Sequence, residues 1–296
     1  MNTQPVEYKA KAFEGRNLAF FFLLAFGISW TTAFLISIFN LDMSASGSGP
    51  FNPFVVLIGV LGTIGPSLAA FVVTGFSEGK AGVKALWKRF WNRNVSLMWL
   101  VVILFLDNAF RLIANLIARA VDGQAYPIVD PSTPLWMFIP ALVAAFIYSG
   151  MAEEFGWRGY ALPRFQARWS ALTSSIVLGV IWLSWHIPYF FTPGVPLYQK
   201  NFWQWAPWVL ILSVIYTWLF NNTKGSVLAP ALFHATMNAS LAILPTTDSL
   251  WYYYGALLLA VILIVVIFDA KNLVRQSVKD ENPHASEMIA VTSKSP

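Results

Sequence analysis

The chain has 296 residues, of which 57% are hydrophobic and only 11% are charged. A typical soluble domain carries about 25% charged residues, so this composition excludes an ordinary water-soluble globular protein. The net charge is +5, but the basic residues form no stripe interleaved with exposed aromatics, so we predict no nucleic-acid partner. Cysteine is absent, which excludes thiolate nucleophiles and cysteine-based metal sites.

Apolar residues occur in long runs, and a run of about 18 or more can cross a bilayer. The runs predict an all-α fold, a polytopic membrane helix bundle with about eight transmembrane helices in a lipid bilayer. In chain order, the predicted spans are 17–39, 54–76, 97–120, 135–152, 172–191, 206–220, 227–244 and 251–268. The first run is longer than the apolar core of a signal peptide and lacks a small-residue cleavage site, so we expect an uncleaved span.

Lysine and arginine residues are distributed unevenly over the predicted loops. With the N-terminus in the cytoplasm, sixteen of the 19 Lys and Arg residues fall in cytoplasmic segments. Lys200 falls in an outside loop, and Arg111 and Arg119 lie within the third span. Positive residues concentrate on the cytoplasmic side of membrane proteins. The distribution therefore predicts a multi-pass protein, in the cell membrane, with both termini in the cytoplasm.

Two segments outside the spans have a composition of their own. Residues 80–94 mix Lys and Arg with large apolar and aromatic side chains, as expected of an amphipathic helix in the cytoplasmic interface. A plain basic loop is the alternative. Residues 280–296 are polar and poor in aromatics, which predicts a disordered cytoplasmic tail. Residues 1–279 then form a single membrane-embedded domain.

Ionisable residues inside a membrane are functional candidates by default, because a charge is costly there. Glu154 and Arg158 are four residues apart and share a helix face, so Arg158 can neutralise Glu154. Glu153 points about 100° away and is not matched by that arginine. A partly buried, unpaired carboxylate suits a general base. The alternative is an interfacial ion pair beside one solvated glutamate.

Two of the three histidines lie in predicted spans. His186 lies near the end of a Trp-rich helix that Pro188 is expected to kink or end. His234 and Asn238 are one helical turn apart, and together they could bind a metal or hold a developing oxyanion. The alternatives are a hydrogen-bonded core histidine for His186 and an interhelical hydrogen bond for the His234–Asn238 pair.

Asp107 and Arg111 are also four residues apart, in the third span. The simplest interpretation is a self-neutralised pair buried in the bundle. Arg119 lies near the outer end of the same span, where its long side chain can reach the interface. These residues are therefore expected to be structural.

Three short motifs follow one another along the chain, EExxxR, WxxxH and HxxxN, formed by Glu153, Glu154, Arg158, Trp182, His186, His234 and Asn238. This order resembles the CAAX-protease and bacteriocin-processing family of intramembrane proteases, also called the abortive-infection family. The family includes the Ras-converting CAAX endopeptidase. Its second motif is FxxxH, so Trp182 replaces the usual phenylalanine with another large aromatic residue.

The resemblance implies a membrane-embedded CAAX-type endopeptidase, a hydrolase that acts on a peptide or protein substrate at the membrane. Prenylated CAAX peptides are the family's eukaryotic substrates. The resemblance also implies that Glu153 and His186 activate the attacking water, and that His234 and Asn238 stabilise the oxyanion. The remaining motif residues support the first motif.

The sequence leaves the metal open. Glu153, His186 and His234 could hold zinc, with water in an open position. The same residues could also work without metal, by general-base and oxyanion chemistry. Asparagine is a poor zinc ligand, which favours the metal-free version for a site that contains Asn238.

Two other functions remain as alternatives. A catalytically inactive relative could act as a membrane scaffold or immunity protein. A proton-coupled transporter could use the same polar residues as a relay. Transporters are often built from inverted repeats, and no such repeat is found in this chain.

Overall fold

The structure is a computed structural model that describes residues 15–41, 43, 53–91, 95–123, 128–241, 243–246 and 249–275. Within these residues the fold is entirely helical. The elements are α1 Gly15–Ile38, α2 Pro53–Phe90, α3 Leu97–Asp122, η1 Leu135–Met137, α4 Phe138–Ala145, η2 Phe146–Met151, α5 Ala152–Glu154, η3 Phe155–Ala161, α6 Leu162–Gln166, α7 Ala171–Trp185, η4 Ile187–Phe190, α8 Phe202–Asn222, α9 Leu228–Leu241 and α10 Leu250–Phe268. The elements from η1 to α6 join end to end, and we call this continuous helix, Leu135–Gln166, the motif helix.

Each of the eight predicted spans corresponds to a helix. Among the described residues, six helices are long and apolar enough to cross a membrane, namely α1, α2, α3, the motif helix, α8 and α10. The other two, α7 and α9, have 15 and 14 residues. At 1.5 Å per residue they are about 22 Å long, less than the bilayer core of about 30 Å. The protein is thus a polytopic helical membrane protein with two short helices.

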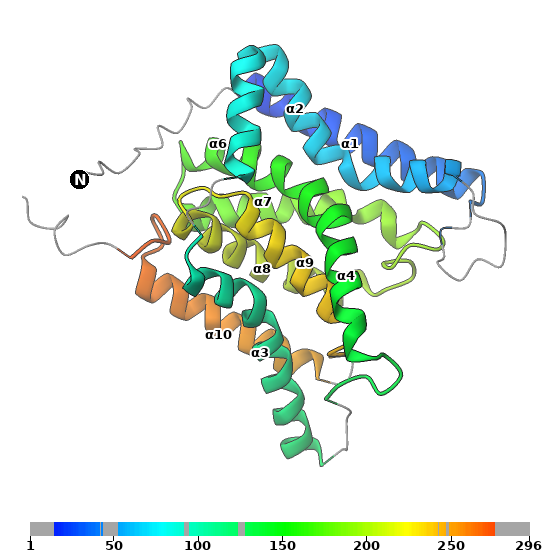
Figure 1. The fold of residues 1–296 in the computed structure, drawn as a ribbon, viewed down its shortest axis with the longest axis vertical. Helices are drawn as coiled ribbons and strands as arrows, with labels where there is room; N and C mark the ends of the chain where they lie inside the picture. The colour runs from blue at the N-terminus through cyan, green and yellow to red at the C-terminus, as the bar shows by residue number, and fades with distance from the viewer. Residues whose placement is uncertain are drawn as a thin grey trace, which may run out of the picture.

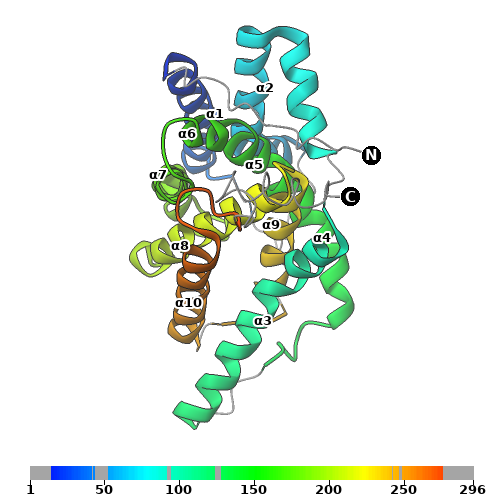
Figure 2. The same cartoon turned by 90° about the vertical axis from the view of Figure 1, so that its left-hand side faces the viewer.

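The short helices lie in the middle of the molecule. In both views the α1–α2 pair and the α3–α10 pair lie at opposite ends, with α7, α8 and α9 between them (Figures 1 and 2). Helix α9 is buried along most of its length, including His234 and its neighbours Phe233 and Ala235. His234 of the third motif lies on α9 and is buried, and His186 of the second motif directly follows α7 and is partly buried.

Helix α2 bends sharply at Gly79. This residue has φ of +63° and ψ of −163°, in a region of backbone conformation that favours glycine. After the bend, residues 80–90 form a second helical arm that buries Leu86 and Phe90 and exposes Lys84. A helix in the predicted amphipathic segment is therefore confirmed up to Phe90. Its place in the interface stays a prediction, and residues 92–94 and the predicted tail at 280–296 lie outside the described residues.

The motif helix is longer than predicted. The sequence placed the end of this span at residue 152, but the helix continues to Gln166, and residues 152–165 are all buried. The charges that suggested an end are compatible with a buried helix, because Glu154 and Arg158 neutralise each other within it. The glutamate pair is therefore inside the helix rather than at its end.

The motif helix packs against its neighbours at two glycines. A Cβ atom on Gly150 would lie 2.5 Å from the backbone oxygen of Ala231 in α9, and one on Gly156 would lie 2.5 Å from the backbone oxygen of Pro66 in α2. Two π-helical segments, η2 and η3, flank Glu153 and Glu154. Such segments occur frequently at functional sites.

Candidate active site

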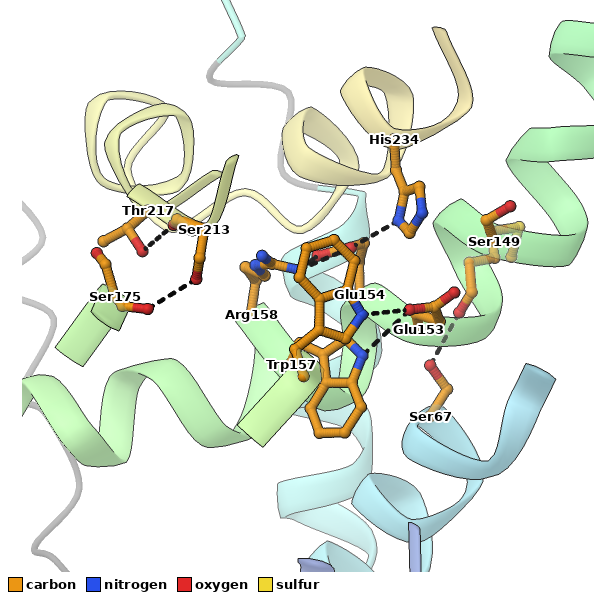
Figure 3. A network of polar contacts seen from close by, with 12 residues as sticks. Ser67, Ser149, Glu153, Glu154, Trp157, Arg158, Ser175, Ser213, Thr217 and His234 are labelled. Carbon is orange, nitrogen blue, oxygen red and sulfur yellow. Dashed lines mark hydrogen bonds and ion pairs between the residues drawn. The ribbon is translucent and has the colours of Figure 1, made fainter. Parts of the chain in front are cut away.

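Glu153 is buried, and no Lys or Arg of the described residues lies close enough to neutralise it. Its side chain lies in the interior with the residue 5% exposed, and no Lys or Arg of the described residues forms an ion pair with it. Its Oε2 atom instead accepts two indole hydrogen bonds, from Trp157 Nε1 at 3.2 Å and from Trp182 Nε1 at 2.8 Å (Figure 3). Glu153 is thus the carboxylate that Arg158 leaves unmatched, as the helix geometry predicted.

Glu154 is held from two sides. Arg158 Nη1 donates to its Oε1 and Oε2 at 2.9 and 3.0 Å, and His234 Nδ1 lies 2.9 Å from the same Oε1. The Arg158 guanidinium also contacts two aromatic rings, 4.0 Å from the ring centre of Tyr216 and 4.7 Å from that of Trp182. These contacts connect the first motif to α7, α8 and α9, so Glu154 and Arg158 fix the geometry of the site.

The hydrogen bonds of the two histidines define which ring nitrogens remain available. His186 Nδ1 lies 2.7 Å from the backbone oxygen of Trp182. A carbonyl oxygen can only accept, so Nδ1 carries the proton and Nε2 keeps its lone pair. His234 Nδ1 faces the Glu154 carboxylate and, by the same reasoning, donates to it. In both rings Nε2 remains for a water molecule or a substrate.

Trp182 is where the predicted site residues meet. Its indole N–H bonds Glu153, and its ring centre lies 5.5 Å from that of His186 and 5.7 Å from that of His234. His186 itself follows the last residue of α7, which ends before Pro188 as predicted. One side chain therefore contacts three polar residues that are far apart in the sequence.

Asn238 is attached to the motif helix. Its Nδ2 donates to Ser149 Oγ at 2.9 Å, and Ser149 precedes Glu153 by one helical turn. Asn238 also lies one turn after His234 on α9. The other six residues of the three motifs are connected by hydrogen bonds or ring contacts, and Asn238 is tied to the helix of Glu153 through Ser149.

Comparison with known proteins agrees with this arrangement. Residues 134–240, which contain every site residue named above, match the family described as Type II CAAX prenyl endopeptidase Rce1-like. This part of the chain is similar to the Rce1-like endopeptidases. A protein of Methanococcus maripaludis named CAAX prenyl protease 2 is 25% identical over 219 residues, which cover 68% of this chain and 78% of that protein. The family resemblance inferred from the three motifs is confirmed.

Three residues of this Rce1-like site were not predicted from the sequence. Trp157 follows Glu153 by four positions, so helical spacing indicates that the two side chains are neighbours. The prediction missed this contact because it paired Glu153 only with charged side chains. Ser149 precedes Glu153 by four positions and carries the same signal. Tyr216 lies on α8 and contacts Arg158 across the bundle, and no spacing in the sequence indicates that contact.

The arrangement does not match a metal site. Among the described residues, no group of three or more His, Asp or Glu side chains is placed to hold a metal ion. The zinc set considered for this Rce1-like chain was Glu153, His186 and His234. The bond from His234 Nδ1 to Glu154 leaves Nε2 available and is compatible with a metal ligand, so the misfit is in the placement of the three side chains, which do not form such a group. The chemistry below therefore uses protein groups alone.

The predicted pair of Asp107 and Arg111 is present in a second polar network, away from these residues. Arg111 Nε lies 2.6 Å from Asp107 Oδ2, and both side chains are fully buried. Tyr253 of α10 donates to Asp107 and accepts from Arg111 Nη2 at 3.3 Å and from Trp208 Nε1 at 3.2 Å. The network joins α3, α8 and α10, so the structural interpretation of the pair is supported.

Proposed function

We propose that this protein is an intramembrane endopeptidase that hydrolyses a peptide bond of a membrane-associated substrate by glutamate-activated water. The observation that carries the proposal is the buried Glu153 carboxylate. It has no cationic partner among the described residues. It accepts a hydrogen bond from Trp182, and the ring of Trp182 contacts the imidazoles of His186 and His234. The family description and the name of the archaeal relative make a prenylated CAAX peptide the first substrate to test.

In this proposal, Glu153 and His186 activate the water. Oε2 of Glu153 is occupied by two indole donors, so Oε1 accepts the proton of the water as its oxygen attacks the peptide carbonyl carbon. The lone pair on His186 Nε2 accepts a hydrogen bond from the other O–H of the water and orients it, and that hydrogen stays on the attacking oxygen. When the C–N bond breaks, the proton on Glu153 passes to the leaving amine.

His234 and Asn238 stabilise the oxyanion that forms on the carbonyl oxygen. His234 does so as an imidazolium, which donates from Nδ1 to Glu154 and from Nε2 to the oxyanion. Both are on α9, one turn apart, and both are oriented by the motif helix, His234 through Glu154 and Asn238 through Ser149. Asn238 uses one of its two amide N–H groups for Ser149, so the other can donate to the oxyanion. Donors fixed in advance in a dry interior stabilise developing charge more than mobile ones in water.

The proposal is tested with purified protein in lipid nanodiscs and an internally quenched, farnesylated CAAX peptide. We expect Glu153→Gln to lower kcat about a thousandfold, because the amide cannot accept the proton from water. An unprenylated peptide of the same sequence reports how much the lipid contributes to KM. Cleavage at the wild-type rate by the Glu153→Gln variant would contradict the proposal.

The matched control is Glu78→Gln, the same chemical change outside the site. Glu78 pairs with Arg164 at 2.9 Å, and we expect its variant to keep the wild-type kcat. A strong zinc chelator is expected to leave cleavage unchanged. Loss of activity with the chelator, followed by recovery on addition of zinc, would replace the metal-free mechanism with a zinc-dependent one.

A further inference from the structure

The two tryptophans that donate hydrogen bonds to Glu153 occupy different kinds of position in the family motifs. Trp157 belongs to a variable position of the first motif, and Trp182 stands where the second motif has phenylalanine. A phenyl ring fills similar space but has no N–H group, whereas the indole has one donor and no acceptor. The hydrogen bond from Trp182 to Glu153 is therefore a property of this chain that the motif does not provide.

Both donors end on the same carboxylate oxygen. Trp157 Nε1 and Trp182 Nε1 lie 3.2 and 2.8 Å from Oε2 of Glu153, and Figure 3 shows the two bonds converging there. An oxygen of a carboxylate has about two lone-pair sites, so two donors use the full capacity of Oε2. The other oxygen, Oε1, is then the one that can receive a proton.

The two indoles are themselves held rigidly. Trp157 is completely buried and packs edge-on against Phe21 and Trp185, with ring centres 5.9 and 5.8 Å apart. Trp182 is 2% exposed and packs edge-on against Tyr216 at 5.5 Å. Since neither ring has space to turn, the two N–H groups keep fixed directions.

We propose that Trp157 and Trp182 act as a pair of positioning residues, the indole clamp, which fixes the orientation of the Glu153 carboxylate and makes Oε1 the catalytic base. The terminal torsion of a glutamate is broad and is not fixed by staggering, so a carboxylate without such donors rotates. The clamp restricts that rotation. The inference rests on the proposed function, because it assigns the base within that mechanism.

Kinetics with the farnesylated peptide test the clamp. Removing one hydrogen bond to a charged group by Trp182→Phe is expected to lower kcat about tenfold, and the Trp157→Phe/Trp182→Phe double variant about a hundredfold. KM is expected to change less than twofold, because neither indole is proposed to touch the substrate. Phenylalanine is the usual residue at position 182 in the family motif, so the fold is expected to accept it.

The matched control is Trp218→Phe. Trp218 is a buried tryptophan of α8 that packs against Trp99 and Phe268, and its Nε1 has no hydrogen-bond partner within the described part of the chain. Its variant removes the same atoms without removing a hydrogen bond, so kcat is expected to stay at the wild-type value. A clamp of merely structural importance would lower the unfolding temperature and leave kcat per folded molecule unchanged.

A spectroscopic readout does not need a substrate. The chain has 14 tryptophans, and ¹⁵N labelling of their indoles gives one N–H signal for each. The signals of Trp157 and Trp182 are assigned by their loss in the Phe variants, and Glu153→Ala is expected to shift both while the Trp218 signal stays in place. Unshifted Trp157 and Trp182 signals would overturn the proposal.

The kinetic results of the variants distinguish a failure of the indole clamp from a failure of the proposed function. Cleavage that persists in Glu153→Gln overturns the catalytic base itself. An inactive Glu153→Gln variant together with wild-type kcat in Trp182→Phe and in the double variant overturns only the clamp. A tenfold loss in Trp182→Phe at constant KM, with shifted indole signals, supports the clamp.

Discussion

Arg111 and Arg158 are fully buried, and each is neutralised by an acidic residue one helical turn before it, Asp107 or Glu154. Removing two charges from water is costly, and the attraction between them offsets the cost only if further contacts complete the geometry. Each arginine has such contacts. Arg111 hydrogen-bonds the hydroxyl of Tyr253, and Arg158 contacts the rings of Trp182 and Tyr216.

The Asp107–Arg111 pair yields a stability prediction. Asp107→Leu leaves Arg111 buried without a counter-charge, which is expected to cost about 3–5 kcal/mol. The double variant Asp107→Leu/Arg111→Leu removes both charges and is expected to unfold at a higher temperature than the single variant. Thermal unfolding in detergent measures the difference. A double variant less stable than Asp107→Leu would show that the pair itself, rather than the orphaned charge, determines stability.

At the residue scale, the sequence predicted contacts within one helix and missed those between helices. The spacing of Glu154 and Arg158 gave their ion pair correctly, because residues four apart on a helix are neighbours. The bonds from His234 to Glu154 and from Trp182 to Glu153 join different helices. They depend on how the helices rotate and approach each other, which periodicity alone does not specify.

At the scale of the elements, the motif helix is the part on which the site depends, because it carries Glu153 and contacts both α2 and α9. Its close approach to α2 requires a residue without a side chain at position 156. The atom that limits the approach is the backbone oxygen of Pro66, which cannot turn aside as a flexible side chain would. The helix must therefore move if that glycine is replaced.

Gly156→Ala is accordingly expected to displace the motif helix and lower kcat/KM at least about tenfold, with a loss of stability of about 1–3 kcal/mol from overpacking. The matched control is Gly27→Ala on α1, where an added Cβ meets no atom of the described residues within 4 Å. That variant is expected to match or slightly exceed the wild-type stability, because alanine favours a helix over glycine. Peptide cleavage and thermal unfolding measure both effects. A Gly156→Ala protein as active and stable as Gly27→Ala would contradict the packing argument.

Helix positions were predictable from hydropathy, and helix ends less so. Hydropathy ended the predicted span at residue 152, because Glu153 and Glu154 interrupt the apolar run there. The structure buries both instead. Glu154 pairs with Arg158 in the same helix and with His234 of α9, and Glu153 accepts two indole hydrogen bonds. In α2, by contrast, the boundary between the predicted span and the predicted amphipathic segment falls close to the bend at Gly79. A glycine indicates a possible bend from the local sequence alone. Neutralisation of a charge by a residue of another helix depends on the packing of the helices and cannot be predicted locally.

At the scale of the whole molecule, segments predicted to be cytoplasmic meet at one end of the bundle. Asn221, in the last turn of α8, donates to Gln166 at the end of the motif helix and to the backbone oxygen of Asn272 after α10. The backbone N–H of Val227 donates to the backbone oxygen of Arg89 at the end of α2. These segments were assigned to the same side from charge alone, so packing and charge favour the same arrangement of the chain.

The opposite end is held in a similar way by segments assigned to the outside. The backbone N–H of Asp130, between α3 and the motif helix, donates to the backbone oxygen of Ile243 after α9. Arg111 also contacts Thr246 of that connection. If one helix did not cross the membrane, a loop assigned to the inside would lie at this end. The two sets of contacts therefore support an even number of crossings, in which the short helices α7 and α9 also cross.

This topology leads to a labelling experiment for which the chain is well suited, because it contains no cysteine. Single cysteines at the exposed positions Lys200 and Ser132 are expected to react with a membrane-impermeant maleimide in intact cells. Cysteines at the exposed positions Lys88 and Lys271 are expected to react only after permeabilisation, because the excess of Lys and Arg near them holds these segments in the cytoplasm.

Ala235→Cys, on the buried face of α9, is the control that should stay unlabelled under both conditions. Reaction of the Lys88 or Lys271 cysteine in intact cells would place the basic loops outside and invert the orientation. Reaction of all four exposed cysteines in intact cells would mean that the cells leak, and the Ala235 control cannot detect that. A cytosolic protein with an exposed cysteine is therefore a second control, and it must stay unlabelled in intact cells. When it does, labelling of the Lys200 and Ser132 cysteines together with protection of the Lys88 and Lys271 cysteines is predicted only by the proposed orientation.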